Sequence, residues 1–439
     1  MKLHTAVLKT TRYRTGSIHN KTGFPPGEWW IASQLQPEAF HAMPMDPVTY
    51  AEAMRSEYSE KWDDAIQKEY NSLMEQKVWE VCPLPAGRKA VGCKWVFKRK
   101  YNAEGQIARY KARLVAKGFS QKEGIDYHEV FSPVVQISSL RVLLAIAVER
   151  GWEIQQMDVD TAFLHASIQE VIYMEQPQGF QVSSENGIEM VCRLNKSLYG
   201  LKQSPRNWSC TLQNWLEQKG FSQTKSDAGI FVYSQEGMQY VLAVYVDDII
   251  IAGPDIPWIN NFKHEMQKQF KIKDLGQAEW VLGISLNYDN DGGTLKLHQS
   301  KYINDLLQRY GMGECKPSKT PIVPGSIPES SAKPNQEIAT QYQSLVGSLL
   351  YAATSTRPDI AYSVSYLSRF MADPEEQHWV AAKRVLRYLK GTQQKGLQFD
   401  RSDSETKDLI GYCDADWAGD CRRRSTTGYV FLMYGAPVS

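Results

Sequence analysis

The sequence lacks paired cysteines and long apolar runs. Its seven cysteines are scattered, and no two of them form a Cys-x-x-Cys pair. This excludes a disulfide framework and a zinc knuckle, and the eight histidines show no ligand spacing either. The longest apolar runs, at 140–148 and 249–253, are far shorter than the roughly 18–20 residues that span a bilayer. The first residues also lack the apolar core of a signal peptide, so we expect an intracellular protein with no membrane partner.

Net charge is almost absent, because 50 Lys and Arg face 49 Asp and Glu. This balance conceals a local asymmetry. Residues 88–122 hold eleven Lys or Arg and a single acid, Glu104. Ten net positive charges in 35 residues repel one another strongly unless a polyanion is bound. The segment therefore indicates a nucleic-acid partner, with a solvated basic face as the alternative.

Composition shifts and periodicity divide the 439 residues into five parts. Residues 1–46 have weak periodicity and are expected to be a linker or an upstream remnant. Residues 47–317 alternate between helical and strand-like patterns. Residues 318–336, rich in Pro and Ser, are the best linker candidate. Residues 337–400 are mainly helical, and 401–439 are strand-like.

Periodicity also predicts the individual elements. Helices are expected around 62–73 and at 138–150, 204–219, 262–270, 341–351, 358–371 and 374–390, the last with an N-cap at Asp373-Pro374. Strands are expected at 93–98 and 113–116, which form a basic hairpin with a turn at Gly105, and at 154–164, which turns into a helix. Further strands are expected at 171–174, 191–194, 230–233, 239–245, 249–251, 409–413 and 429–434.

Two adjacent carboxylates, Asp247 and Asp248, interrupt an apolar strand pattern. They repel each other and are costly to desolvate without a cation. Either both face water in a hairpin turn, or they bind a divalent metal. On this pair alone, the solvated turn is the favoured interpretation.

A third acid changes that balance. Asp158 follows another apolar strand, and it shares a face with Asp160 if the chain is extended, so only one of them need point at a site. Two carboxylates from one strand turn and one from another strand suit a pair of Mg²⁺ ions, with Mn²⁺ as a possible substitute. Such a pair activates a 3′-hydroxyl and stabilises a pyrophosphate leaving group.

The box Tyr245-Val246-Asp247-Asp248 is accompanied by an ordered series of segments. These are Lys94-Trp95-Val96-Phe97-Lys98, Tyr110-Lys111-Ala112-Arg113-Leu114-Val115, Phe131-Ser132-Pro133-Val134-Val135, Gln156-Met157-Asp158-Val159, Ser197-Leu198-Tyr199-Gly200-Leu201-Lys202-Gln203-Ser204-Pro205, Thr356-Arg357-Pro358-Asp359-Ile360 and Arg387-Tyr388-Leu389-Lys390-Gly391-Thr392. Through the box and this series, the sequence resembles, over roughly residues 47–439, the reverse transcriptase region of Ty1/copia-type retrotransposon polyproteins.

The resemblance implies an α+β, right-hand polymerase fold: fingers and an antiparallel palm at 47–317, a thumb-like connection at 337–400 and an incomplete ribonuclease H-like sheet at 401–439. It implies an RNA-directed DNA polymerase that uses an RNA or DNA template, a primer and dNTP, in a cytoplasmic particle or the nucleus. Asp158, Asp247 and Asp248 would be the catalytic metal ligands. Phe163 would lie under the sugar and select dNTP, with plain core packing as its alternative.

Other residues are candidates for binding. Lys111 and Arg113 lie on one strand face and suit the triphosphate. Tyr199 and Gln203 belong to a segment that resembles a turn contacting nucleotide and template, where Gly200 would let the backbone approach a ligand. Lys94, Lys98 and Lys202 are candidate nucleic-acid contacts. The interleaved aromatics Trp95, Phe97, Tyr101, Tyr110 and Phe119 are expected in the core, with base stacking as the alternative.

The predicted helix at 374–390 has Lys383, Arg384, Arg387 and Lys390 along one side. This side could grip a duplex, Arg387 included, or could simply be solvated. Near the end, Asp414 resembles the first metal ligand of the family's ribonuclease H domain. Because one carboxylate cannot hold two metals, we expect no ribonuclease H activity from this chain alone. The rival hypothesis for the whole chain is an inactive retrotransposon remnant that at most binds nucleic acid.

Overall fold

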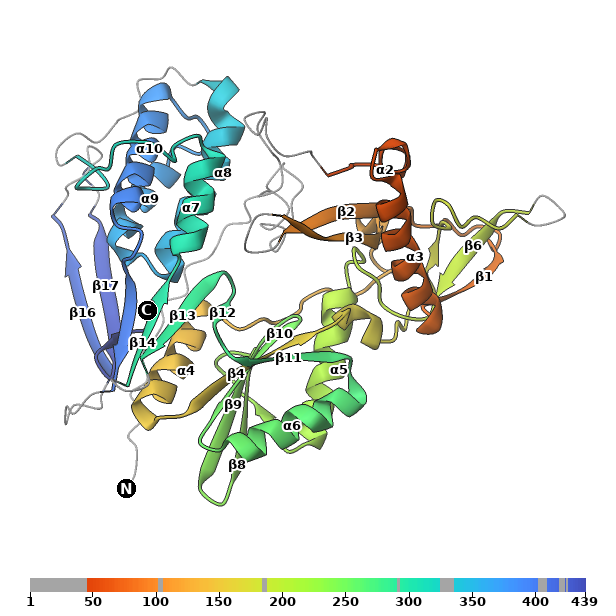
Figure 1. Cartoon of the computed structure of the whole chain (residues 1–439), viewed down its shortest axis with the longest axis horizontal. Helices are drawn as coiled ribbons and strands as arrows, with labels where there is room; N and C mark the ends of the chain where they lie inside the picture. The colour runs from red at the N-terminus through yellow and green to blue at the C-terminus, as the bar shows by residue number, and fades with distance from the viewer. Residues whose placement is uncertain are drawn as a thin grey trace.

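The structure is a computed structural model that describes residues 46–101, 106–183, 188–289, 293–323, 335–401, 409–417, 423 and 425–439. Within these ranges the chain mixes helices with antiparallel sheets (Figure 1). No helix in the described part is long and apolar enough to cross a membrane. The predicted segment 1–46, except Asp46, and the predicted turn at Gly105 lie outside the described residues.

A six-stranded sheet lies at the centre, in the order β11-β4-β10-β9-β8-β7. Its strands are β4 (Glu153–Val159), β7 (Ser222–Gln223), β8 (Ile230–Gln235), β9 (Met238–Tyr245), β10 (Asp248–Gly253) and β11 (Ile272–Gln277). Because strand side chains alternate, the sheet has two apolar faces. One face packs against α5 (Ser204–Gln218) and α6 (Ile256–Gln269), and the other packs against α4 (Ile137–Arg150) (Figure 1).

The basic hairpin is confirmed as β2 (Cys93–Tyr101) paired with β3 (Ile107–Ala116). Its apolar face packs on α3 (Ser59–Glu75), which follows the short α2 (Tyr50–Arg55). Trp62 of α3 is fully buried there, with its ring 5.3 Å from Phe97 and 4.7 Å from Tyr110. A small sheet of β1 (Trp79–Pro83), β6 (Met190–Leu194) and β5 (Tyr173–Met174) completes this part.

A second antiparallel sheet also packs on α4. It therefore lies on the side of the central sheet that faces away from α5 and α6. It comprises β12 (Trp280–Val281), β13 (Ile284–Asp289), β14 (Thr294–His298) and β15 (Gly396–Asp400). Four helices form their own core beyond it: α7 (Ser300–Arg309), α8 (Ala339–Ser355), α9 (Ala361–Ser368) and α10 (Glu376–Gly391). Arg141 of α4 donates to the carbonyls of Thr354 and Ser355, which ties this helical region to the centre.

The predicted C-terminal strands are confirmed as β16 (Leu409–Ala415) and β17 (Thr427–Met433), with β18 (Ala436–Pro437) beside them. Three predictions are wrong in detail. α6 starts earlier than 262, because Asp255 accepts from the Trp258 N–H as its N-cap. α10 starts at Glu376, since Glu375 and His378 form a capping box in place of the expected cap at Asp373. Residues 396–400 form β15 instead of belonging to a helical region.

Candidate active site

The three predicted acids meet at one end of the central sheet. β4 and β10 are antiparallel neighbours, and their register places Asp158 directly opposite Asp248. Residues paired in this way project from the same face of a sheet. Asp247 lies in the two-residue turn between β9 and β10, because Tyr245 pairs with Asp248. Strand pairing therefore brings together three carboxylates that are distant in the sequence.

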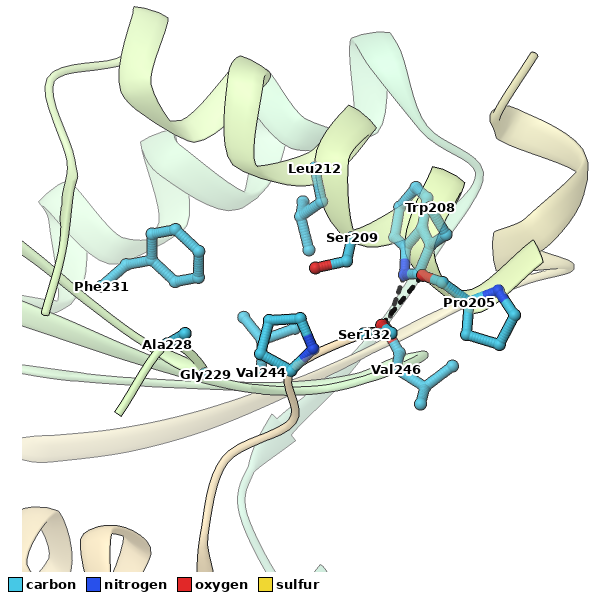
Figure 2. A pocket seen from close by; sticks show the side chains of 11 residues that line it. Ser132, Pro205, Trp208, Ser209, Leu212, Ala228, Gly229, Phe231, Val244 and Val246 are labelled. Atoms are coloured by element: carbon cyan, nitrogen blue, oxygen red, sulfur yellow. Dashed lines mark hydrogen bonds between the residues drawn. The ribbon is translucent and has the colours of Figure 1, made fainter. Parts of the chain in front are cut away.

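The turn that carries Asp247 has a strained backbone. Val246 has a φ of +57°, a left-handed conformation that is rare for a β-branched residue. The indole Nε1–H of Trp208 donates to the Val246 carbonyl at 2.7 Å, and the Val159 N–H donates to the Asp247 carbonyl at 2.9 Å. Figure 2 shows the Trp208 side chain reaching from its helix to the turn. Strain that is held in place by its surroundings is typical of functional sites.

Burial and neighbouring negative charges raise the pKa of Asp158 and of Asp248. Burial, and then the charge of Asp247, raise the pKa of Asp248 to about 6. Burial also raises the pKa of Asp158, followed by the charges of Asp247 and Asp160. Gln156 partly offsets this for Asp248, because its Nε2 donates to Oδ1 at 3.3 Å. Carboxylates in this arrangement ionise together near neutral pH more readily when a cation is close.

The structure separates Asp158 from Asp160. β4 ends at Val159, and the chain then turns sharply at Thr161, where φ is +55°. The Asp160 carboxylate lies 3.0 Å from the ammonium of Lys271, so it already has an ionic partner. Asp158 is thus the acid of this segment that pairs with Asp248.

Magnesium suits this set of oxygen donors. In the described part of the chain, no group of three or more His, Cys, Asp or Glu side chains is placed so that it could hold a metal ion by itself. Mg²⁺ rarely needs one, because it commonly takes one or two carboxylates and completes its shell with water and substrate phosphates. The raised pKa values of Asp158 and Asp248 also favour a nearby divalent cation.

The hairpin of β2 and β3 presents a basic face. Its register pairs Lys98 with Lys111, Lys100 with Arg109, and Val96 with Arg113. Lys94 shares this face with Val96 and Lys98, because every second residue of β2 projects from the same side. The opposite face holds the buried Trp95 and Phe97. These two aromatics are therefore core residues, as predicted.

The inner end of the basic face approaches the acids. The charge of Lys111 acts to lower the pKa of Asp158. Burial, followed by the charge of Arg113, lowers the pKa of Lys111 itself, while Asp160 and Glu69 act in the opposite direction. Lys111 therefore lies within electrostatic reach of the sheet acids and is partly desolvated.

Three predicted nucleotide-binding side chains form a cluster beside the acids. The guanidinium of Arg113 lies 4.7 Å from the centre of the Tyr199 ring. The Tyr199 ring centre in turn lies 4.8 Å from that of Phe163. Burial raises the pKa of Tyr199 to about 12, so its hydroxyl remains protonated. Phe163 is half-buried on the short 3₁₀ helix Ala162–His165, directly after the strand of Asp158.

Gln203 and Gly200 make their close contacts with other parts of the protein. Gln203 is 1 % exposed, and its amide accepts from Gln121 Nε2 at 3.0 Å and donates to the Asp126 carbonyl at 2.7 Å. Both ends of that amide are thus occupied, which corrects the prediction that Gln203 binds nucleotide. A Cβ at Gly200 would lie 2.1 Å from the Ala116 carbonyl oxygen, so its close backbone approach is to β3.

The predicted nucleic-acid contacts fall into two groups. Two of them are exposed lysines, and the other two are side chains that bond to other parts of the protein. Lys94 and Lys98 project from the exposed basic face, although Lys98 also lies 3.4 Å from Asp46. Lys202 donates to the Tyr127 hydroxyl at 3.1 Å. Arg387 donates from Nε to the Lys316 carbonyl at 2.7 Å.

The basic side of α10 therefore holds another segment of the protein. Besides Arg387, Arg384 donates to the Thr320 hydroxyl and Lys390 donates to the Gly313 carbonyl. These bonds fasten residues 313–320 across the helix. Because the donors are already engaged, the structure favours an internal role over the predicted grip on a duplex.

Sequence reasoning missed two residues of this site. Lys273, on the edge strand β11, pairs directly with Asp158 on the side away from Asp248, and its charge acts to lower the pKa of Asp158. Only the strand register identifies it, because 272–277 has no clear alternation in the sequence. Trp208 likewise carries no sequence signal of its contact with the turn.

The space behind the turn is too small for a substrate. A cavity of about 10 Å³, lined by Ser132, Trp208, Ser209 and Val246 among others, lies between α5 and the sheet (Figure 2). This volume suits about one water molecule. The candidate nucleotide site is therefore the open face beside the acids. Far from it, Asp414 is exposed on β16, and its predicted ribonuclease H role stays a prediction.

Comparison with known proteins identifies the family. Residues 76–324 match the family model of reverse transcriptase (RNA-dependent DNA polymerase). The chain is 43% identical over 384 residues to the retrovirus-related Pol polyprotein from transposon TNT 1-94 of Nicotiana tabacum, covering 85% of this chain. It is 41% identical over 433 residues to that from transposon RE1 of Arabidopsis thaliana, covering 98% of this chain.

A putative transposon Ty5-1 protein of Saccharomyces cerevisiae is 37% identical over 284 residues, which cover 64% of this chain and 91% of that protein. The chain spans about 28% of the length of the two plant polyproteins. The chain belongs to the reverse transcriptase family. Within it, the chain groups with Ty1/copia-type retrotransposon Pol polyproteins, which confirms the resemblance found in the sequence.

Proposed function

We propose that this chain is an RNA-directed DNA polymerase that adds dNMP to a primer 3′-end by two-metal catalysis. The observation that carries the proposal is the pairing of Asp158 with Asp248 beside Asp247, at the end of the central sheet that the basic hairpin approaches. In this reading the central sheet is the palm, the β2–β3 hairpin belongs to the fingers, and α7–α10 form a thumb-like connection. The family membership supports this assignment.

Asp158, Asp247 and Asp248 would hold two Mg²⁺ ions, which Mn²⁺ could replace. When bound, such ions lower the pKa of the attacking hydroxyl and stabilise the charge of the leaving pyrophosphate. The protein's own contribution is to fix the carboxylates before substrate arrives. The Trp208 and Val159 hydrogen bonds hold the Asp247 turn, and the β4–β10 ladder holds the other two acids.

The incoming dNTP would lie between the acids and the basic hairpin. Lys111 and Arg113 would bind its phosphates, since both lie on the face that approaches Asp158. Phe163 would lie under the sugar, where a bulky ring excludes a 2′-hydroxyl. Tyr199 would hold Phe163 and Arg113 in position, because its ring contacts both side chains.

Lys94 and Lys98 would contact phosphates of the RNA or DNA template. They extend the basic face away from the acids and are exposed. Exposed lysines on a strand face contribute affinity through counterion release, so template binding should weaken steeply with salt.

Primer extension tests the proposal directly. The wild-type chain and Asp247→Asn are compared on a poly(rA) template with an oligo(dT) primer, dTTP and Mg²⁺. We expect incorporation by the wild type and its loss in Asp247→Asn, because the substitution removes one charge from the metal site. Equal incorporation by both proteins would overturn the assignment. No incorporation by either would instead favour a remnant that at most binds nucleic acid.

A further inference from the structure

A loop between β3 and α4 exposes large apolar side chains. Among the residues of this loop, 117–134, Phe119 is 83% exposed and Phe131 is 70% exposed. Phe119 was expected in the core with its neighbours on β2 and β3, and the structure shows that expectation to be wrong. Two exposed phenylalanine rings in one short loop call for a physical explanation, because each could have been replaced by a polar residue without loss of packing.

The loop is firmly anchored, and its anchors are polar. Gln121 is 5% exposed, and its amide donates to Gln203 and accepts from the Lys202 N–H. Farther along, Arg206 forms an ion pair with Glu129 at 2.6 Å and donates to the Phe131 carbonyl at 3.2 Å.

Two more bonds complete the attachment. Tyr127 accepts from Lys202, and the Ser132 hydroxyl donates to the Pro205 carbonyl at 3.0 Å. Every anchor named here lies within residues 202–206, at the start of α5. The loop is therefore fixed over a small area by these polar contacts, while its two phenylalanine rings are exposed.

The position of the loop points to its partner. A Cβ on Gly118 would lie 2.0 Å from the Gly200 carbonyl oxygen, so Phe119 begins next to the turn that carries Tyr199. At the other end, Ser132 lines the cavity behind Val246, which places Phe131 near the turn of Asp247. The two rings thus belong to segments that lie next to two turns of the candidate active site, those of Tyr199 and Asp247.

The loop itself holds two lysines and three acids, so it is the neighbouring basic hairpin that favours nucleic acid over protein. The Lys117 N–H bonds to the Gly92 carbonyl, which joins the loop to the base of the basic hairpin. Within the described ranges, neither Lys122 nor Lys202 forms an ion pair with a carboxylate. Aromatic rings next to an exposed cation such as Lys122 suit unpaired bases and their phosphates, because every base offers a π-face to stack on.

We propose that Phe119 and Phe131 are stacking platforms for unpaired bases of the template strand beside the active site. The proposal rests on the proposed polymerase function and deepens it, since it names the residues that meet the template before it pairs. The rigid loop would hold these rings in place, so little ordering would be needed on binding.

A binding comparison tests this. The whole chain is titrated against a primer–template with a 5′ template overhang of about six nucleotides and against the blunt duplex of equal length. A 2-aminopurine in the overhang reports stacking through loss of its fluorescence. The proteins compared are the wild type, Phe119→Ala, Phe131→Ala and Phe119→Leu. Tyr362→Ala is the control, because Tyr362 is 50% exposed on α9 in the helical region.

We expect the wild type to prefer the overhang and to quench 2-aminopurine. Each alanine variant should bind the overhang about 5- to 150-fold more weakly, the range for loss of one stacked base, with blunt-duplex affinity unchanged. Phe119→Leu should also lose quenching, since it keeps apolar area but no ring. Tyr362→Ala should behave as the wild type.

Two results would overturn the inference. One is a full overhang preference in both alanine variants. The other is a change of sedimentation in these variants with overhang binding intact, which would assign the rings to a protein contact. The failure of the polymerase proposal is distinguishable. A wild type that binds overhangs through Phe119 but extends no primer refutes polymerisation alone, whereas normal extension with ring-independent binding refutes only this inference.

Discussion

Asp158 and Asp248 project from the same face of the central sheet as directly paired residues of β4 and β10. Burial and like charges raise the pKa of both, to about 6 for Asp248. The folded protein without metal is therefore less stable with these acids ionised than with them neutral. A sheet that only needed to be stable would place apolar residues here. It does so two residues farther along β10, where the next side chain on this face is the buried Ile250.

Asp248→Asn should separate stability from activity. Removing one charge relieves the repulsion from Asp247 and Asp158, so the melting temperature in EDTA should rise. Primer extension should fall by more than about 100-fold, because changing even an outer contact of a metal ligand costs about 10- to 100-fold. Thermal unfolding and steady-state extension with Mg²⁺ measure the two effects. Asp400→Asn, an exposed acid on β15, should change neither. A lower melting temperature for Asp248→Asn would contradict the electrostatic argument.

Trp208→Phe tests whether the strained turn is held from α5. The change keeps a ring in the core and removes the Nε1–H that bonds to the Val246 carbonyl. We expect a loss of about 1 kcal/mol in the free energy of unfolding, the usual cost of one hydrogen bond. We expect a larger effect on kcat, about 10-fold or more, because the turn carries Asp247. Trp215→Phe on the same helix is the matched control. A loss of stability with unchanged kcat would show that the bond only supports packing.

The sequence predicted those parts of the site that local pattern encodes. The acids stand after apolar strand runs, so their joint position follows once the strands pair. Lys273 could not be found in this way, because β11 contains a bulge between Asp274 and Gly276 that breaks alternation. The burial of polar side chains could not be predicted from the sequence either. Gln203 looks like any polar loop residue until its contacts with Gln121 and Asp126 are seen.

The same limit applies to the elements of the fold. The helix α4 was predicted to within one residue, and α3 was predicted in place but extends a few residues beyond 62–73 at both ends. β14 and β15 were missed because they pair across a long stretch of chain, which no local pattern reports. The start of α10 was misplaced because Asp373-Pro374 offers a conventional cap, while tertiary packing buries Glu375 and His378 and selects their capping box.

Arg113→Lys should raise the KM for dNTP. The planar guanidinium lies 4.7 Å from the Tyr199 ring and can bind phosphate through two bonds, whereas an ammonium cannot reproduce both contacts. We expect KM to rise about 10-fold with a smaller change in kcat. Arg109→Lys, farther out on the same strand face, is the control and should leave KM unchanged. An equal effect of both substitutions would indicate general charge loss at the hairpin instead of a specific contact.

Asp359→Asn should make the stability of the helical region less dependent on pH. Arg357 is 1% exposed and donates to Asp359 through Nε at 2.9 Å and through its terminal nitrogen at 2.8 Å, and Tyr388 donates at 2.7 Å. Burial alone would raise the pKa of Asp359, but the hydrogen bonds from Arg357 and Tyr388 outweigh it and hold the pKa below its usual value. This pair therefore contributes stability above the unfolded pKa of about 3.9, and the contribution is lost as pH falls through the lower folded pKa.

The variant should thus be about 1–3 kcal/mol less stable than the wild type near neutral pH, allowing for the partly exposed carboxylate. The difference should persist down to about pH 4 and shrink below it, because both proteins then carry a neutral side chain at 359. Urea unfolding of the two proteins across this range gives the measurement. Asp373→Asn, an exposed acid just before α10, is the control and should show no such pH-dependent difference. If the gap between Asp359→Asn and wild type stayed constant through the acid range, the ion pair would not be its source.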